Sequence, residues 1–259
     1  MQISWFIASD IDNTLTGNRE ALDTLRARFD QKRQKGELFL ALSTGRRLSQ
    51  VIEGFNQEGI PHGDAVISQV GTEIYLPPFS DGEPPLKEWN DMLMQDFSRQ
   101  EAESFLQDLN GVTMQPEEFN TPLKVSCYID SEDNPEKTVT EIQRRAAAAG
   151  GAYQVVWSSG RDLDIIPAGA GKGKAIRFLL LYLELEPESV IVCGDSGNDR
   201  SMFDEFEQGI IVGNARPELK KMQEENPPES LYFAQRWYAA GVHEGLVYFN
   251  AIERGEHNE

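Results

Sequence analysis

Short runs of apolar residues alternate with amphipathic stretches through the first third of the chain. The runs at residues 5–8, 38–43 and 65–68 have strand length and lack polar alternation, which is typical of parallel strands buried on both faces. Two segments between them carry apolar residues at helical spacing: Leu22, Leu25 and Phe29 in the first, and Leu48, Val51, Ile52 and Phe55 in the second. The order strand–helix–strand–helix–strand predicts a parallel sheet with right-handed crossovers.

The apolar pattern breaks at residues 77–85, which contain four prolines. Proline-rich composition of this kind indicates a linker. After it, helices are expected near residues 98–109 and 135–149, and strands near 112–114, 123–129, 153–157 and 163–166. Residues 167–171 provide a return linker. These limits predict a smaller α+β unit at residues 80–167, inserted between the two halves, 1–79 and 168–259, of a larger domain.

Helix and strand patterns alternate again after the return linker. Helices over residues 172–185, 200–206, 217–225 and 240–253 are expected, with strands at 189–193 and 210–212. The polar tail after Arg254 is expected to fray. The whole pattern predicts an α/β protein: a doubly wound, Rossmann-like parallel-sheet core with an inserted, smaller α+β cap domain.

The net charge of −19, from 43 acidic and 24 basic residues, narrows the function. Nucleic-acid and anionic-membrane binding need basic surface, so we expect neither partner. No run of 18 apolar residues is present and the N-terminus lacks the basic lead-in of a secretory signal, so we expect a cytoplasmic protein. Cys127 and Cys193 lie in apolar runs without metal-ligand spacing, and we expect both to be buried thiols.

Two carboxylates follow the first strand directly. Asp10 and Asp12 lie at its carboxyl end, where open α/β sheets bind their ligands. Because carboxylates this close repel one another, a bound divalent cation is the simplest explanation, and Mg²⁺ suits a site with few oxygen ligands. A calcium loop is excluded, since its sixth and twelfth positions hold Leu15 and Ala21 in place of Gly and Glu. A plain acidic turn stays open as an alternative.

Polar residues also follow later strands or begin a helix, at Thr44, at Lys172, and at Asp195 with Asp199. In a doubly wound sheet these positions meet at one crevice, so segments about 150 residues apart are expected to build one site. Taken singly, each segment has an ordinary alternative: a capped turn at Thr44, a solvated helix start at Lys172, and a loop turn at Asp195.

The predicted set of side chains favours phosphoryl transfer, because it combines carboxylates, an ammonium group and a hydroxyl, with no Ser-His-Asp arrangement. As a hypothesis, Asp10 attacks phosphorus, while Asp12 protonates the leaving sugar oxygen and then activates water. Thr44 and Lys172 would hold the phosphoryl oxygens as charge develops. A magnesium ion would cancel enough charge for an anionic nucleophile to approach an anionic substrate.

Together these motifs resemble, in order, the four motifs of haloacid-dehalogenase-superfamily phosphatases, and residues 80–167 are similar to that superfamily's cap. The quoted motifs are residues 10–14 (Asp-Ile-Asp-Asn-Thr), 43–46 (Ser-Thr-Gly-Arg), Lys172, and 194–199 (Gly-Asp-Ser-Gly-Asn-Asp). The resemblance implies Mg²⁺ held by Asp10, Asp12, Asp195 and Asp199. It implies phosphate binding by Thr44, Gly45, Arg46, Lys172 and Asn198.

A narrower resemblance is to the sucrose-phosphate and mannosylfructose-phosphate phosphatases. It is carried by residues 70–75, 124–126 and 158–167 for the former and 111–115, 209–215 and 240–245 for the latter. It implies a phosphatase for a disaccharide phosphate, most simply sucrose 6-phosphate, with sugar binding by Gln69, Glu73, Lys124, Ser159, Arg161 and Asp162. An ordinary exposed sheet face is the alternative reading of these cap residues.

Three other functions stay open at this point. The substrate could be mannosylfructose phosphate or a glucosylglycerol-type phosphate, because a few hydrogen bonds in the cap decide the sugar. The chain could also be a catalytically silent sugar-phosphate-binding partner of the synthase that makes the substrate. Association of an active enzyme with that synthase is equally open. The presence of all the expected catalytic side chains argues against silence.

Overall fold

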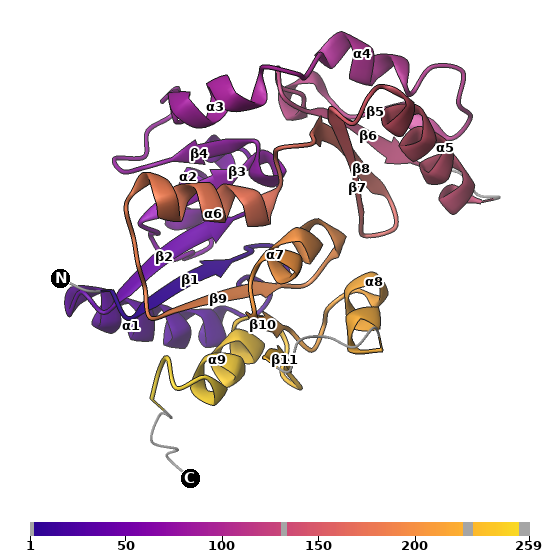
Figure 1. Ribbon diagram of the computed structural model, residues 1–259. Coiled ribbons are helices and arrows are strands. Elements are labelled where there is room, and N and C mark those ends of the chain that lie inside the picture. The colour runs from indigo at the N-terminus through magenta and orange to yellow at the C-terminus, as the bar shows by residue number, and fades with distance from the viewer. Residues whose placement is uncertain (1–2, 131–133, 225–229, 254–259) are drawn as a thin grey trace.

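A parallel sheet forms the centre of the molecule in the computed structural model, which describes residues 3–130, 134–224 and 230–253. Within these residues, seven strands run in the order β11-β10-β9-β1-β2-β3-β4 (Figure 1), and only β4 is antiparallel to its neighbour. The strands are β1 (Trp5–Ser9), β2 (Leu38–Ser43), β3 (Ala65–Ser68), β4 (Glu73–Tyr75), β9 (Ser189–Gly194), β10 (Gln208–Ile211) and β11 (Leu231–Phe233). The predicted α/β fold class is confirmed.

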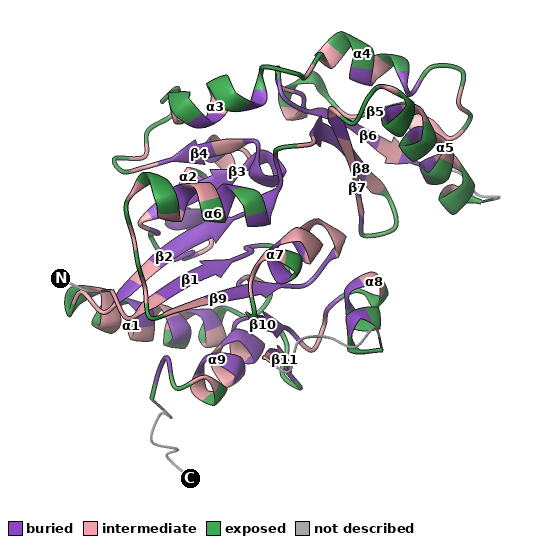
Figure 2. Ribbon diagram, in the orientation of Figure 1, coloured by how far each residue is buried: buried purple, intermediate pink, exposed green. Residues whose placement is uncertain are grey.

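The central position of β1 explains why its sequence is apolar on both faces. It pairs in parallel with β2 on one side and β9 on the other, so that Ala8 lies between Ala41 and Val192. The strands of this sheet are mostly buried, whereas the covering helices expose their outer faces (Figure 2). Polar residues that follow β1, β2 and β9 therefore emerge at one edge of the sheet.

Helices cover both faces of the sheet (Figure 1). They are α1 (Arg19–Gln34), α2 (Leu48–Gln57), α6 (Lys172–Tyr182), α7 (Arg200–Glu205), α8 (Pro217–Lys220) and α9 (Tyr238–Tyr248). The α1 helix begins where the Asn18 side chain accepts a 3.0 Å hydrogen bond from the Ala21 amide, and it buries Leu22, Leu25 and Phe29 as predicted.

A further four described strands form a separate antiparallel sheet in the order β5-β6-β8-β7. They are β5 (Val112–Met114), β6 (Val125–Ile129), β7 (Tyr153–Ser158) and β8 (Asp162–Pro167), and they carry α4 (Arg99–Ser104) and α5 (Pro135–Ala148). Cys127, Leu163 and Ile142 belong to the hydrophobic core of this unit. Figure 1 shows this smaller sheet beside the carboxyl-end edge of the larger one.

The elements that the sequence did not predict include a helix and a strand of the described structure. The helix α3 (Lys87–Leu93) lies within the predicted insert, yet it packs on the larger unit: Trp89 Nε1 donates to Gly71 O at 3.2 Å, and the Trp89 ring lies 4.9 Å from that of Phe178. The other element is the three-residue strand β11, whose sequence is too short to show a period.

Several predicted boundaries differ from the observed ones. The helix expected over residues 98–109 ends at Ser104, and Asp108 adopts a positive φ of 59°. The last helix spans Tyr238–Tyr248 in place of residues 240–253. The helix predicted over residues 217–225 continues beyond α8 only as a short 3₁₀ turn, and its last residue lies outside the described residues, as does the tail after Arg254.

Cys127 and Cys193 are buried free thiols, as predicted, and burial raises the pKa of both. Among the described residues, no helix combines the length and the apolar character that a bilayer span requires.

Candidate active site

A buried lysine joins two carboxylates from distant parts of the chain. Lys172, at the start of α6, donates from Nζ to Asp10 Oδ1 at 2.8 Å and to Asp199 Oδ1 at 2.6 Å. The lysine and Asp199 are fully buried, and Asp10 is 4% exposed. The Asp10 amide in turn donates to Cys193 O at 2.9 Å, which ties the end of β1 to β9. Three of the four predicted segments thus meet here.

Asp199 is fixed by the loop after β9. Its Oδ2 accepts hydrogen bonds from the amides of Asp195 and Ser196 at 2.9 and 3.0 Å, while its Oδ1 accepts from Lys172. Both carboxylate oxygens are therefore engaged by the protein. Through these hydrogen bonds Asp199 links the loop after β9 to the ammonium of Lys172.

Three acidic side chains come together around an open carboxylate oxygen. One ligand atom each of Asp10, Asp195 and Asp199 lies within 4.8 Å of the others. Asp10 Oδ2 is buried and has no hydrogen-bond partner among the described residues. A buried oxygen without a donor is costly unless a cation binds it, and an all-oxygen set suits Mg²⁺. These residues therefore fit a magnesium ion.

The shifted pKa values in the cluster indicate that its carboxylates are not fully neutralised by Lys172. Burial and the neighbouring carboxylates of Asp199 and Asp195 raise the pKa of Asp10 well above its usual range, despite the contact with Lys172. Burial and the charge of Asp199 raise the pKa of Asp195 to about 7. Burial lowers the pKa of Lys172, but the two carboxylates outweigh it and keep the ammonium charged.

Asp12 lies outside this carboxylate cluster. Its two oxygens accept hydrogen bonds from Arg46 Nη2 and Nε at 2.7 and 2.9 Å. Arg46 also donates to both oxygens of Glu58, at 2.6 and 2.8 Å. The predicted metal ligand Asp12 and the predicted phosphate ligand Arg46 thus bind each other here, although both line the same hollow as Asp10.

Backbone hydrogen bonds connect the loop that follows β2 to β3 and to the turn that follows β3. The Thr44 amide donates to Ile67 O at 2.8 Å, and the Val70 amide donates to Thr44 O at 3.0 Å. Val70 adopts a φ of 60°, an outlier for a β-branched residue, and such strain persists only where surrounding structure enforces it. Thr44 itself is fully buried, and its Oγ1 accepts from the Arg46 amide at 3.1 Å.

A hollow of about 260 Å³ opens above the carboxylates, between the two sheets. The predicted residues that line it are Asp10, Asp12, Gly45, Arg46, Lys124, Ser159, Asp162, Asp195 and Asn198. Residues that sequence analysis missed line it as well: Asn13, Gln50, Val70, Gln115, Phe119, Ser158, Asp164 and Ser196. Asp164 carried a usable signal, because it lies two residues after Asp162 and so on the same face of β8.

The smaller sheet contributes a buried polar network to this hollow. Lys124 Nζ lies 2.8 Å from Ser126 Oγ and 3.3 Å from Asp164 Oδ1, and Ser126 Oγ lies 2.6 Å from Asp164 Oδ1. Beside it, Gln115 Nε2 donates to Asp162 Oδ1 at 3.2 Å. These groups present donors and acceptors to the same space, as a hydroxyl-rich ligand requires.

Three predicted sugar ligands lie elsewhere in the described structure. Glu73 accepts hydrogen bonds from Ser68 Oγ and Tyr75 OH, at 2.9 and 3.0 Å, within the larger sheet. Gln69 is buried in the turn after β3, with its Oε1 unpartnered among the described residues. Arg161 lies 3.5 Å from Asp130 and stacks over a ring of the smaller sheet, away from the lining of the hollow.

Two contacts join the smaller unit to the larger one beside the hollow. Arg47 Nη2 lies 3.3 Å from Glu118 Oε1, and its guanidinium lies 5.6 Å from the centre of the Phe119 ring. On the other side, the Ser159 amide donates to Glu218 Oε1 of α8 at 3.2 Å. Apolar side chains of the smaller unit, Val156 among them, also belong to the hydrophobic core of the larger one, so the two units share buried packing as well.

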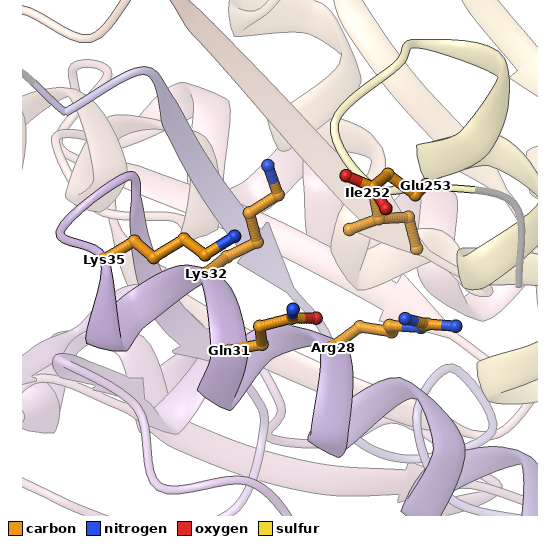
Figure 3. Close-up of a pocket in the computed structure, with 6 residues that line it drawn as sticks. All are labelled: Arg28, Gln31, Lys32, Lys35, Ile252 and Glu253. Carbon is orange, nitrogen blue, oxygen red and sulfur yellow. The ribbon is translucent and has the colours of Figure 1, made fainter.

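Two hollows away from the carboxylates lack comparable chemistry. A larger one, of about 810 Å³, lies between α1 and α9, where Arg28 and Arg236 are balanced by Glu20 and Glu244. A small one between α1 and the segment after α9 holds about 10 Å³, no more than a single water needs (Figure 3). Among the described residues, neither of these two hollows combines buried carboxylates with a buried lysine, as the cluster at Asp10 does.

A family model and two curated relatives match most of the chain. The family model of sucrose-6F-phosphate phosphohydrolase matches residues 4–250. The chain is 30% identical over 253 residues to sucrose-phosphatase 1 of Nicotiana tabacum, covering 94% of this chain and 59% of that protein, so it spans well under two thirds of that relative's length. It is also 30% identical over 249 residues to the mannosylfructose-phosphate phosphatase of Agrobacterium fabrum, covering 96% and 98% of the two chains.

Solved structures are also similar to this chain over most of its length. The sucrose-phosphatase of Synechocystis sp. PCC6803, crystallised with sucrose and phosphate, aligns with a TM-score of 0.89 and 30% identity, over 96% of this chain and 99% of that one. The sugar phosphatase BT4131, of haloacid-dehalogenase subclass IIB, aligns with a TM-score of 0.63 at 16% identity, which speaks for the fold alone. The chain therefore belongs to the sucrose-6F-phosphate phosphohydrolase family, within the haloacid-dehalogenase fold.

Proposed function

We propose that the protein is a Mg²⁺-dependent phosphatase that hydrolyses a disaccharide phosphate, with sucrose 6-phosphate as the first candidate. The observation that carries the proposal is the pairing of one buried ammonium with a carboxylate cluster that retains an open oxygen, Asp10 Oδ2, beneath a polar hollow. Family membership supports the same chemistry.

In the proposed reaction, the Asp10 carboxylate attacks phosphorus and forms an aspartyl phosphate as the bond to the sugar oxygen breaks. Lys172 holds Asp10 in place through a hydrogen bond to Oδ1. Asp10, Asp195 and Asp199 are the residues whose grouping fits the metal. When bound, a magnesium ion would neutralise charge between the anionic nucleophile and the anionic substrate.

Asp12 is proposed as the general acid and base. It would give its proton to the departing sugar oxygen, then take a proton from the water that hydrolyses the aspartyl phosphate. Its place on the wall of the hollow, two residues after Asp10, supports this assignment. The proton that leaves in the first step is thus restored in the second, and the enzyme returns to its starting state.

We propose residues 80–167 as the cap that selects the sugar, with α3 an exception because it packs on the larger unit. Lys124, Gln115, Asp162 and Asp164 would bind sugar hydroxyls. The cap would close over a bound sugar phosphate and exclude water from the reaction.

Mannosylfructose phosphate is the second candidate substrate, because the chain resembles the Agrobacterium mannosylfructose-phosphate phosphatase over 96% of its own length. It resembles the Synechocystis sucrose-phosphatase over the same share, 96%. The identity is 30% in both cases, so sequence similarity does not choose between the two sugars.

The test is phosphate release, with Mg²⁺ and with chelator, from sucrose 6-phosphate, mannosylfructose phosphate, glucosylglycerol phosphate, trehalose 6-phosphate and glucose 6-phosphate. We expect Mg²⁺-dependent turnover with a strong preference for one fructose-containing phosphate. Weak and equal activity on all five would overturn the disaccharide assignment. Absence of release, with binding retained, would support a silent binding partner of the synthase instead.

A further inference from the structure

A chain of ion pairs links Asp12, in the first motif, to Glu58, at the C-terminal end of α2. Glu58 binds Arg46 through both carboxylate oxygens, and Arg46 binds Asp12 through both of its oxygens, with the four contacts between 2.6 and 2.9 Å. Two consecutive bidentate pairs fix the plane as well as the position of each group, because the guanidinium fork is rigid. Nothing in the proposed chemistry so far uses Glu58.

The fold makes room for this arrangement at a helix-interior glycine. A Cβ added to Gly54 of α2 would lie 3.0 Å from Arg46 Nη1, 3.3 Å from Glu58 Oε1 and 2.5 Å from Ile60 Cδ1. Glycine inside a helix is less stable than alanine, so its presence here accompanies a close approach that a side chain would obstruct. The Arg46 side chain is 15% exposed, whereas the side chains of Asp12 and Glu58 are 51% and 40% exposed.

We propose that Glu58 is a positioning residue for the leaving-group proton transfer: through Arg46, it orients the carboxyl of Asp12 toward the hollow above Asp10. The inference rests on the proposed phosphatase function. Arg46 is then an orienting group rather than a phosphate ligand, since its Nε, Nη1 and Nη2 atoms all donate to carboxylates. The Arg46 amide, which donates to Thr44 Oγ1, ties the same residue to the phosphate-binding loop.

The two roles for Arg46 differ in how they depend on the leaving group. A phosphate ligand acts on the phosphoryl group, which is the same in every monoester, so its loss lowers kcat/KM for all substrates alike. A group that orients the general acid matters only when the leaving oxygen needs a proton. The value of kcat/KM reports events up to the first irreversible step, the departure of the leaving group, and therefore excludes the later hydrolysis of the aspartyl phosphate.

The experiment compares kcat/KM for p-nitrophenyl phosphate, whose leaving group departs as a stable anion, with phenyl phosphate, which has nearly the same shape and a more basic leaving oxygen. Wild type, Glu58→Gln, Arg46→Lys and Asp12→Asn are measured with Mg²⁺. Glu58→Gln removes charge at constant shape, and Arg46→Lys keeps charge but removes the fork. Glu53→Gln on the exposed side of α2, where Glu53 accepts from Gln57, is the matched control.

We expect Glu58→Gln and Arg46→Lys to lower kcat/KM for phenyl phosphate about 10- to 100-fold, the range for a misplaced catalytic group, with less than about a threefold loss for p-nitrophenyl phosphate. Asp12→Asn should show the same selectivity more strongly, and Glu53→Gln should match wild type. The retained p-nitrophenyl phosphate activity also demonstrates that each variant is folded.

Equal losses on both substrates in the Glu58 and Arg46 variants, with selectivity confined to Asp12→Asn, would overturn the positioning role and leave the proposed function intact. Unchanged kinetics in Glu58→Gln would reduce the network to a structural ion pair and overturn it as well. A wild-type protein that releases no phosphate from either ester or from the sugar phosphates would overturn the proposed function itself.

Discussion

Replacing Lys172 with methionine tests the electrostatic core of the site. The change keeps the length of the side chain and removes the ammonium that lies 2.8 Å from Asp10 Oδ1 and 2.6 Å from Asp199 Oδ1. At an effective dielectric constant of about 20, each contact is worth about 6 kcal/mol of attraction before desolvation. Removing one partner of a buried pair costs about 3–5 kcal/mol, a large share of the about 5–15 kcal/mol that stabilises a typical domain.

The loss of folding free energy in Lys172→Met should depend on pH. Burial and neighbouring carboxylates already raise the pKa of Asp10, and loss of the ammonium raises it further. A carboxyl whose pKa is raised in the folded state contributes stability at low pH and loses it as pH rises toward that pKa. The deficit of Lys172→Met relative to wild type should therefore be larger at pH 8 than at pH 5.

The assay is urea unfolding of the metal-free proteins at both pH values, together with phosphate release in Mg²⁺. Lys174→Met is the control, because Lys174 lies two residues along the same helix and donates only to Ala168 O in an exposed position. We expect Lys172→Met to lose activity by at least about 100-fold, as when a charge-stabilising donor is removed. An unfolding free energy equal to that of wild type at pH 8 would refute the reasoning.

Three further results follow from the geometry. The affinity for Mg²⁺ should fall about 10-fold per pH unit below about 7, because the pKa of Asp195 is raised to about 7 and the metal needs the ionised carboxylate. Calorimetry at pH 6 and pH 8 measures the affinity, and a pH-independent affinity would contradict the prediction. Gly71→Ala should lower the free energy of unfolding by about 1–3 kcal/mol and remove much of the activity, since the added Cβ would lie 2.3 Å from the Gly171 carbonyl carbon. Gly82→Ala is the control, because Gly82 also has a positive φ but lies in open space, and it should change thermal stability and turnover far less. Equal losses in the two variants would count against a specific clash. Lys124→Met should raise KM for the preferred sugar phosphate about 10-fold or more while sparing p-nitrophenyl phosphate, and a parallel loss on both would remove Lys124 from sugar binding.

Much of the fold was predictable because it rests on local patterns. Apolar runs of strand length and helical spacing of Leu22, Leu25 and Phe29 are written in consecutive residues, and the observed elements match them. The helix α3 was missed because it is seven residues long and holds to the core largely through Trp89. Burial of that ring depends on Phe178, 89 positions later, which no local pattern reveals.

The site was predictable to the extent that topology brings strand ends together. That rule places Asp10 and Asp199 in reach of Lys172 without any knowledge of side-chain contacts. It does not say which neighbours exchange hydrogen bonds, so the pairing of Asp12 with Arg46, 34 positions apart, was not anticipated.

The smaller sheet was harder to interpret for the same reason. Its polar residues alternate between faces, and the resemblance named Lys124 and Asp162 but also Arg161, which points along a different surface beside Asp130. The pairing register between strands determines which polar side chains lie next to one another on a face of the sheet. In the β6–β8 pair, Ser126 lies opposite Asp164. Register between strands about 40 positions apart is set by packing of the whole sheet, not by the sequence of either strand.

Replacement of Asp10 by asparagine tests the central claim most directly, because it changes one oxygen to nitrogen at the proposed nucleophile. The measurement is phosphate release from the preferred sugar phosphate in saturating Mg²⁺, with binding of the same compound followed by calorimetry. We predict a loss of turnover of at least about 1,000-fold with binding retained, since covalent catalysis ends while the hollow persists. Turnover by Asp10→Asn at the rate of wild type would contradict the account.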